Sequence, residues 1–262
     1  MRWNILKVMD LFKLEGKTAI VTGGARGLGA QIAQGYAEAG ANVVICSRKL
    51  EACQEKSEEI KKYGVDSLAF ACDVSNPDDV KKVVEETKSH FGTIDILVNN
   101  SGATWAAPVV DMPFEAWQKV MNVNVNGTFL MSQEVGKVMI EQKKGKIINI
   151  ASVAGFGGAD PKYMDTIGYN TSKGAIITFT KDLAVKWGQH NINVNAIAPG
   201  FFPTKMSKGL LDQGKEEILE GTPLNRLGSE QDLIGPALFL ASKASDYVSG
   251  DIVTVDGGAH AY

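Results

Sequence analysis

The sequence is short of cysteine, of uncharged apolar runs and of linker-like composition. Its three cysteines, Cys46, Cys53 and Cys72, are odd in number and form no C-x-x-C pair, which argues against a disulfide framework or a structural zinc site and fits a reducing cytoplasm. No run of about 18 apolar residues is free of charge, so no membrane-spanning segment is expected. No proline- or serine-rich linker and no repeat divides the chain. These absences favour a cytoplasmic protein without internal domain boundaries.

An excess of charge of either sign is also absent. The 27 basic and 30 acidic residues are interspersed and leave a formal net charge of -3, which provides no footprint for nucleic acid or for an anionic membrane. With 44% hydrophobic and 22% charged residues, the composition is that of a globular protein and excludes a disordered or fibrous chain. A length of 262 residues is marginal for two domains of usual size. The expected partner is therefore a small molecule.

Two regions of the chain differ in pattern. Residues 1–14 alternate apolar and charged side chains without the apolar run or cleavage site of a signal peptide, so we expect an N-terminal extension packed against the body. In residues 15–262, short β-branched runs alternate with segments of helical period, which is typical of βαβ units and of a parallel sheet covered on both faces. We predict one α/β domain with seven strands: Thr18–Val21, Asn42–Cys46, Ser67–Ala71, Ile94–Val98, Lys146–Ile150, Ile192–Ala198 and Ile252–Val255.

Local signals add detail between these strands. Ser75 is expected to cap the helix that follows it, with Pro77 in the first turn of that helix. The segment Phe201–Gly228 carries little strand signal and is expected to form a lid or substrate loop.

A glycine-rich turn follows the first predicted strand. It reads Thr22-Gly23-Gly24-Ala25-Arg26-Gly27-Leu28-Gly29 and leads directly into a helical segment. Glycine permits positive φ and close backbone approach, while the free N–H groups and the positive dipole at a helix start attract a pyrophosphate. Because the spacing differs from G-x-G-x-x-G, the turn matches the general dinucleotide motif only loosely, and a purely structural role stays open.

Further motifs follow the later strands in a fixed order. Asn99-Asn100-Ser101-Gly102 follows the fourth strand, Ser152 follows the fifth, Tyr169-x-x-x-Lys173 opens the next helix, and Pro199-Gly200 follows the sixth. Together with the glycine turn, from about Glu15 to the C-terminus, they resemble the classical branch of the short-chain dehydrogenase/reductase family. The resemblance implies a Rossmann-type, doubly wound parallel sheet, a nicotinamide dinucleotide cofactor and the interconversion of a carbonyl and a secondary alcohol.

The resemblance also implies which residues hold the dinucleotide. They are the turn residues Gly23, Gly27, Leu28 and Gly29, then Asp73 and Val74 beside the adenine, Asn99 and Gly102, Tyr169 and Lys173, and Pro199, Gly200 and Thr204 in Pro199-Gly200-Phe201-Phe202-Pro203-Thr204. Three of these residues have other readings. Asp73 can be an ordinary carboxylate at a strand end, and Asn99 can tie two strands together. Thr204 can cap a helix over Lys205–Leu211.

The end of the second strand bears on the choice of cofactor. A carboxylate there would accept both ribose hydroxyls of NAD(H) but would repel the 2′-phosphate of NADP(H). The sequence has Cys46-Ser47-Arg48-Lys49 and no acid before Glu51. Arg26 and Arg48 can form a cationic fork around a phosphate, with the Ser47 hydroxyl as a further donor. We therefore predict NADP(H), in the form NADPH for reduction.

Carbonyl reduction also needs a proton donor beside the carbonyl oxygen. Tyr169 and Lys173 are four residues apart and share a helix face, so the ammonium can lower the phenol pKa from its usual value of about 10. The resemblance gives Ser152 a hydrogen bond to the substrate oxygen and gives Asn124 a water that relays protons to Lys173. Among three neighbouring asparagines, only Asn124 stands three residues before Gly127, as N-x-x-G requires.

The spacing between Ser152 and Tyr169 departs from the family pattern. Sixteen residues separate them, which indicates an insertion near residues 160–165 that borders the substrate pocket. Tyr163 lies nearer the usual position, but the residue four places on is Ile167 rather than a lysine. Tyr169 is therefore the predicted acid.

Substrate class and assembly are less determined by the sequence. We expect reduction of a 3-oxoacyl thioester or hydrophobic ketone, with a gluconate 5-dehydrogenase or other sugar or polyol dehydrogenase as the alternative and a non-catalytic NADP-binding regulator as a remote one. The apolar wall would come from Ala103, Thr104, Trp105, Phe156, Met164, Phe201, Phe202, Met206 and Leu210, whereas a sugar acid would need a cation from Lys162, Lys205 or Lys208. The resemblance implies a homotetramer, with one interface from residues 124–143 and 169–189 and another near Ile252–Val255.

Overall fold

A seven-stranded parallel sheet forms the centre of the molecule. The computed structural model describes residues 7–162, 164–205 and 207–261, except for the side chains of Lys208, Leu210 and Gln213. The strand order is β3-β2-β1-β4-β5-β6-β7, and every neighbouring pair is parallel. The strands are β1 Thr18–Thr22, β2 Asn42–Ser47, β3 Ser67–Ala71, β4 Ile96–Asn99, β5 Gly145–Ile150, β6 Ile192–Pro199 and β7 Ile252–Val255. The predicted fold class and number of strands are confirmed.

Strand ends shift by one or two residues from the prediction. The fourth strand begins at Ile96 rather than Ile94, because the β1–β4 ladder starts where Ala19 faces Ile96. Just before it, the buried Asp95 carboxylate accepts hydrogen bonds from Lys17 Nζ at 2.9 Å and from the Thr18 amide at 3.2 Å. The Asp95 amide also donates to Thr18 O at 2.9 Å, so side-chain bonds reinforce the backbone pairing at this end of the sheet.

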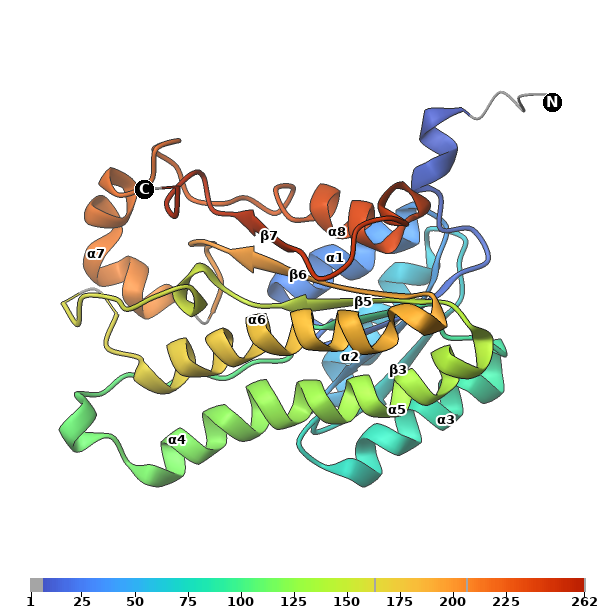
Figure 1. Cartoon of the computed structure of the whole chain (residues 1–262), viewed down its shortest axis with the longest axis horizontal. Coiled ribbons are helices and arrows are strands. Elements are labelled where there is room, and N and C mark those ends of the chain that lie inside the picture. The colour runs from blue at the N-terminus through green and yellow to red at the C-terminus, as the bar shows by residue number, and fades with distance from the viewer. Residues whose placement is uncertain (1–6, 163, 206, 262) are drawn as a thin grey trace.

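Helices cover both faces of the sheet (Figure 1). They are α1 Gly27–Glu38, α2 Leu50–Lys61, α3 Pro77–Phe91, α4 Phe114–Met121, α5 Gly127–Gln142, α6 Ile167–Trp187, α7 Lys208–Glu220 and α8 Ile234–Ala241. Shorter turns are η1 Val8–Phe12, η2 Val109–Asp111, η3 Asn122–Asn126 (a π turn), η4 Val153–Gly155, η5 Gly188–His190 and η6 Lys243–Ser245. One core cluster packs α1, α2 and α8 on one face, and a second packs α3, α5 and α6 on the other. None of the helices described is long and apolar enough to cross a bilayer.

The helix after the third strand begins differently from the prediction. Its N-cap is Asn76, whose Oδ1 accepts a hydrogen bond from the Asp78 amide at 2.9 Å. The Ser75 hydroxyl instead donates to Asp73 Oδ1 at 2.6 Å. The predicted Ser75 cap is therefore wrong by one residue, because Pro77 is the first helical residue and the cap must directly precede it.

The segment predicted as a lid or substrate loop contains a helix. Within residues 201–228, α7 spans Lys208–Glu220 and is kinked at Gly214, where φ is -145° and ψ is 35°. Figure 1 shows α7 at the end of the molecule toward which β6 and β7 point. In a doubly wound sheet, that end is where ligands bind, so α7 lies beside the expected site.

Candidate active site

The glycine turn is built as a cradle at the start of α1. Gly23 and Gly27 have φ of +63° and +55°, which non-glycine residues rarely adopt. A Cβ at Gly29 would lie 2.5 Å from the carbonyl oxygen of Gly23, so the turn closes tightly only with glycine there. The N-cap Arg26 makes no side-chain capping bond, which leaves the first N–H groups of α1 without that acceptor. This turn fits a pyrophosphate.

Residues on β1 and after β4 hold the turn in place. The Thr22 hydroxyl accepts the Asn100 and Ser101 amides, each at 3.0 Å, and donates to Val98 O at 3.3 Å. Asn100 Nδ2 donates to the carbonyl oxygens of Thr22 and Gly23 at 2.9 and 3.2 Å. Sequence reasoning did not assign a role to Asn100, although its place in the Asn-Asn-Ser-Gly motif was visible. It is the tie between the turn and the β4 end.

The corner at the end of β2 carries cations and a hydroxyl. Arg26 and Arg48 are exposed, Ser47 is half-buried, and Ser47 Oγ lies 3.0 Å from Cys53 Sγ. Hydrogen bonds from Ser75 hold the pKa of Asp73 below its usual range, and the Arg48 charge adds to the effect. Asp73 belongs to the loop after β3, and the end of β2 itself, Ser47-Arg48-Lys49, carries no carboxylate. These residues fit a 2′-phosphate.

Three of the predicted cofactor residues have clear packing roles. Leu28 is partly buried against the core on the α1 side of the sheet. A Cβ at Gly127 would lie 2.6 Å from Cγ2 of Val74, so α5 approaches the β3–α3 loop closely at Val74. A Cβ at Gly200 would lie 2.7 Å from that of Asp256, which packs the loop after β6 against the one after β7. Pro199 is buried and Gly102 is half-buried.

Asn99 is committed to the interior. Its Nδ2 donates to Ser132 Oγ at 3.0 Å and to Asn149 Oδ1 at 2.9 Å, and Asn149 Nδ2 donates to Thr180 Oγ1 at 2.9 Å. These bonds join β4, α5, β5 and α6. The side chain of Asn99 therefore ties strands and helices together, which is the alternative role that the sequence left open for it. The cofactor contact of Asn99 stays a prediction.

Thr204 faces the glycine turn. A Cβ built on Gly27 would lie 3.9 Å from Cγ2 of Thr204, so the loop after β6 reaches across toward the start of α1. The Thr204 hydroxyl lies 3.3 Å from the Ser207 amide, which donates to it, and α7 begins at Lys208. Thr204 thus stabilises the turn before α7, and the position directly before that helix belongs to Ser207.

The four predicted catalytic residues come from three segments: Ser152 precedes η4, Tyr169 and Lys173 lie on α6, and Asn124 lies in η3. Ser152 follows β5, and its hydroxyl accepts the Ala154 amide at 3.2 Å. Lys173 on α6 is buried and donates from Nζ to the Ile150 carbonyl at 2.6 Å. Nζ also lies 5.6 Å from the centre of the Tyr169 ring, and Ser152 hydrogen-bonds the phenol. Three of the four therefore lie together at the carboxyl end of β5.

Burial controls the charges of this group. It lowers the pKa of Lys173 to about 8. It also raises the pKa of Tyr169 above 10.0, and the hydrogen bond with Ser152 opposes that rise. The predicted lowering of the phenol pKa by Lys173 is not what this geometry produces, because the ammonium is turned toward Ile150 O and the ring is desolvated. The phenol is thus protonated at neutral pH.

Asn124 lies in the π turn before α5 and is buried. Its Oδ1 accepts the Ala103 amide at 2.7 Å, and its Nδ2 donates to Ala103 O at 3.0 Å and to Ser172 Oγ at 2.8 Å. The Ser172 hydroxyl in turn donates to Tyr169 O at 2.7 Å. Asn124 is therefore connected to the helix turn that carries Tyr169 and Lys173. Ser172 was missed in the sequence, where only its place beside Lys173 pointed to it.

The predicted apolar wall is only partly present. Phe202 is 5% exposed and belongs to the core cluster of α1 and α8. The prediction that Phe202 lines the substrate pocket is therefore wrong. The ring of Phe156 stacks on His260, with centroids 4.3 Å apart. Trp105 is 45% exposed. Tyr163 and Met206 lie outside the described residues, as do the side chains of Leu210 and Lys208.

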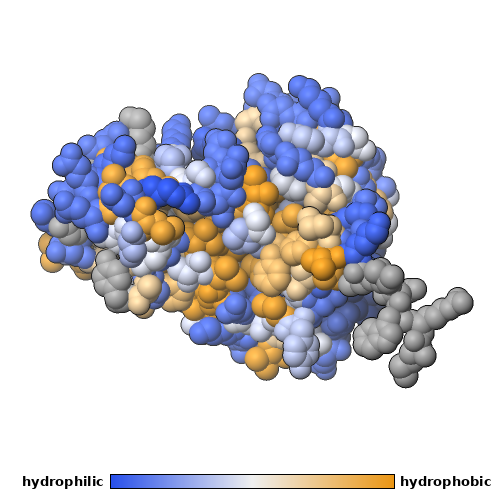
Figure 2. All heavy atoms as spheres, turned by 90° about the horizontal axis from the view of Figure 1, so that it is seen from above, coloured by the Kyte–Doolittle hydropathy of each residue, from blue (hydrophilic) through white to orange (hydrophobic). Residues whose placement is uncertain are grey.

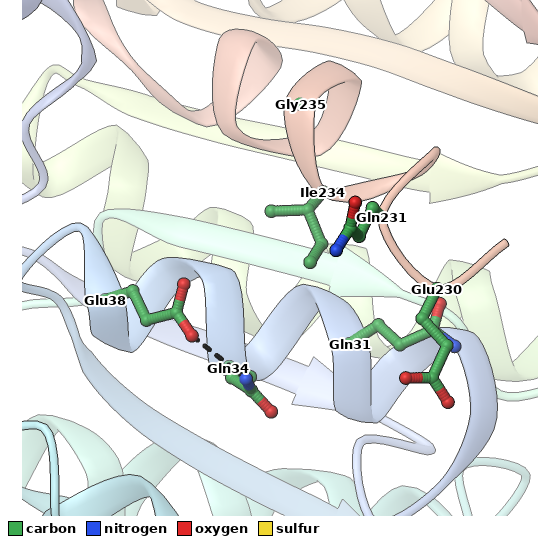
Figure 3. Close-up of a pocket in the computed structure, with 7 residues that line it drawn as sticks. All are labelled: Gln31, Gln34, Glu38, Glu230, Gln231, Ile234 and Gly235. Atoms are coloured by element: carbon green, nitrogen blue, oxygen red, sulfur yellow. Dashed lines mark hydrogen bonds between the residues drawn. The ribbon is translucent and has the colours of Figure 1, made fainter.

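A separate hollow of about 440 Å³ lies between α1 and α8 (Figure 3). It is lined by Gln31, Gln34, Glu38, Glu230, Gln231, Ile234 and Gly235. The Gln34 amide donates to Glu38 at 2.9 Å within it. None of the predicted site residues lines this hollow, so it is not the candidate active site.

Comparisons with known proteins find relatives along nearly the whole chain. A family model described as enoyl-(acyl carrier protein) reductase matches residues 23–260. A 2-dehydro-3-deoxy-D-gluconate 5-dehydrogenase from Pseudoalteromonas atlantica is 41% identical over 96% of this chain and 98% of its own length. A 3-oxoacyl-[acyl-carrier-protein] reductase from Aquifex aeolicus is 38% identical over 94% and 98%. The crystal structure of a gluconate 5-dehydrogenase from Burkholderia cenocepacia, in complex with NADP and tartrate, superposes with a TM-score of 0.93 at 35% identity, covering 98% of this chain and 100% of that one.

Proposed function

The chain belongs to the short-chain dehydrogenase/reductase family, and from this premise we propose that it uses NADP(H) to interconvert a polyhydroxylated keto acid and its secondary alcohol. The chain is an oxidoreductase of the class that acts on CH–OH and C=O groups. The observation that supports the assigned residues is the grouping of Ser152, Tyr169 and Lys173 at the end of β5.

Each residue has a step in the proposed reduction. NADPH, when bound, would supply the hydride that the carbonyl carbon accepts. Tyr169, protonated at neutral pH because burial raises its pKa, donates its phenolic proton to the carbonyl oxygen. Ser152 donates a hydrogen bond to the same oxygen and stabilises the developing charge. Lys173 and Asn124 return a proton to the phenolate from solvent, and oxidation of the alcohol follows the same steps in reverse.

The substrate class rests on which side chains the loops offer. Phe202 lies in the core, so the apolar wall expected for a hydrophobic ketone loses one aromatic ring, and one face of Phe156 is stacked on His260. Lys205 is exposed and follows Thr204, which faces the glycine turn. Its ammonium is a suitable partner for a carboxylate. The gluconate-type relatives act on such acids, which supports the same choice.

A side-by-side assay tests the substrate class. NADPH oxidation is followed with 5-keto-D-gluconate and with a 3-oxoacyl ester, and we expect the higher kcat/KM for the sugar acid. Lys205→Ala should raise KM for the sugar acid about tenfold and leave kcat little changed, whereas the exposed Lys137→Ala on α5 should change neither. A higher kcat/KM for the 3-oxoacyl ester would favour the acyl-reductase reading, to which the Aquifex relative also points.

The proposed assembly is a homotetramer in the cytoplasm. Figure 2 shows apolar residues gathered on the middle of the face seen from above, the side on which Figure 1 places α8 and β7. β7 is an edge strand, and Ile252, Val253 and Val255 on it are only partly buried. On the other helix layer, Phe129 of α5 and Val185 of α6 are 47% and 83% exposed. A second and a third copy of the chain would cover these surfaces.

A further inference from the structure

The hydroxyl at the end of β2 has a buried thiol as its neighbour. Ser47 Oγ lies 3.0 Å from Cys53 Sγ, and Cys53 is completely buried in the first turns of α2. The other contacts of this hydroxyl are long, at 3.4 Å to the Lys49 amide and 3.4 Å to the Lys49 carbonyl. The thiol is therefore the nearest partner of the Ser47 hydroxyl.

The direction of this hydrogen bond matters for anion binding. A serine hydroxyl has one hydrogen to donate and two lone pairs that accept. Either Ser47 or Cys53 can be the donor in this pair. If the S–H group donates to Ser47 Oγ, the serine hydrogen has only the long 3.4 Å contact to the Lys49 carbonyl and can turn from it to an anion at the end of β2.

The state of the thiol suits the role of donor. Burial raises the pKa of Cys53, so the sulfur carries its hydrogen at neutral pH. A protonated thiol is a weak donor whose position in α2 is set by core packing rather than by solvent. The exposed Arg48 next to Ser47 supplies charge but little fixed direction, since an exposed side chain samples several rotamers.

We propose that Cys53 is a positioning residue, which turns the Ser47 hydroxyl so that it donates to the 2′-phosphate of NADP(H). The preference for NADP(H) over NAD(H) then depends in part on a buried thiol that does not touch the cofactor. This inference rests on the NADP(H) assignment and on the placement of Ser47 in that cofactor's site.

Equilibrium binding of two fragments tests the proposal without turnover. Isothermal titration measures Kd for 2′,5′-ADP, which carries the 2′-phosphate, and for 5′-AMP, which lacks it. Cys53→Ala should weaken 2′,5′-ADP binding about three- to tenfold, the effect of one hydrogen bond, and leave 5′-AMP binding unchanged. Cys53→Ser, which restores a donor, should recover most of the loss. Cys53→Val, which fills the space without a donor, should behave like Cys53→Ala.

Matched variants separate positioning from packing. Ser47→Ala should cause a similar loss, and the double variant Ser47→Ala/Cys53→Ala should lose little more than either single one, because both remove the same hydrogen bond to the phosphate. Cys46→Ala is the control, since Cys46 is equally buried but belongs to the core on the opposite face of the sheet. Cys46→Ala should change the Kd for 2′,5′-ADP and the Kd for 5′-AMP by the same factor.

Several results would overturn the inference. They are an equal loss for both fragments in Cys53→Ala, additive losses in the double variant, or no rescue by Cys53→Ser. The NADP(H) assignment fails separately, if the unmodified protein binds 2′,5′-ADP no more tightly than 5′-AMP or if Arg48→Asp does not abolish the difference. If Arg48→Asp abolishes the preference for 2′,5′-ADP but Cys53→Ala does not weaken it, the NADP(H) assignment stands and only the role of the thiol is refuted.

Discussion

The fold buries the charged ammonium group of Lys173 at the candidate active site. Lys173 is 5% exposed, and its ammonium donates to the Ile150 carbonyl. Burial lowers the pKa of this ammonium from 10.5 to about 8. In the unfolded chain the pKa returns to its ordinary value. Below about pH 8 the folded protein therefore carries the full cost of a buried charge, and this cost shrinks to nothing as the pH rises to 10.5.

A Lys173→Met variant should reveal this cost. At pH 6–7 we expect a higher Tm than that of the unmodified protein, because a side chain of similar length fills the space without a charge. The gain should diminish between pH 8 and 10.5, and activity should be lost throughout. Thermal melts at several pH values measure the difference. The exposed Lys186→Met on α6 should show no such pH-dependent gain, and an equal Tm difference at every pH would contradict the buried-charge argument.

Tyr169 provides a test of the proton donor. Tyr169→Phe keeps the ring and removes the hydroxyl that hydrogen-bonds Ser152, so we expect cofactor binding to persist while kcat falls at least a hundredfold. Stopped assays give kcat, and quenching of tryptophan fluorescence gives the NADPH affinity. Retention of more than about a tenth of kcat, a loss under roughly 1.4 kcal/mol, would show that another group donates the proton.

Elements position these residues through close backbone packing. η4, which Ser152 caps, lies directly against α6 at Lys173: a Cβ on Gly155 would lie 2.6 Å from the Lys173 carbonyl carbon and 2.8 Å from its oxygen. A larger residue cannot fit without moving η4 or α6 apart. The absence of a side chain at Gly155 thus keeps Ser152 and Lys173 in register.

Gly155→Ala should therefore affect both stability and catalysis. We expect a loss of about 1–3 kcal/mol in the free energy of unfolding, as for overpacked sites, and a fall in kcat larger than the change in KM for NADPH. Gly157→Ala is the matched control in the same loop, because a Cβ there would meet nothing within 4 Å. Denaturant unfolding and steady-state kinetics measure both variants. Identical behaviour of the two would contradict a role for the close η4–α6 contact.

The whole molecule leaves two apolar surfaces open, at the β7 edge and along α5 and α6. Light scattering at micromolar concentration is expected to give about four times the chain mass of 28.1 kDa. Val185→Lys should reduce the assembly to dimers, because it places a charge in the proposed α5–α6 interface. The fold should stay intact, since Val185 is 83% exposed in the single chain. Tyr63→Lys, at a site 44% exposed near the end of α2, should leave the mass unchanged. A monomeric unmodified protein would contradict the proposed tetramer.

Features that depend on local spacing could be predicted from the amino-acid sequence. The strand and helix periods predicted seven parallel strands, because β-branched runs that alternate with helical segments are typical of βαβ units. The glycine turn was equally readable, since positive φ at Gly23 and Gly27 is a property of those residues and of the helix that follows. Tyr169 and Lys173 share a helix face because they are four residues apart.

Features that depend on where distant segments meet could not be predicted in this way. Phe202 is as apolar as a pocket residue but lies in the core, and the side chain of Asn99 ties β4 to α5 and β5, which its sequence position alone left open. The pKa of Tyr169 rises rather than falls because the fold desolvates the phenol and turns the Lys173 ammonium to Ile150. Burial and the direction of a polar side chain are set by neighbours from other elements, and no periodicity along one segment contains them.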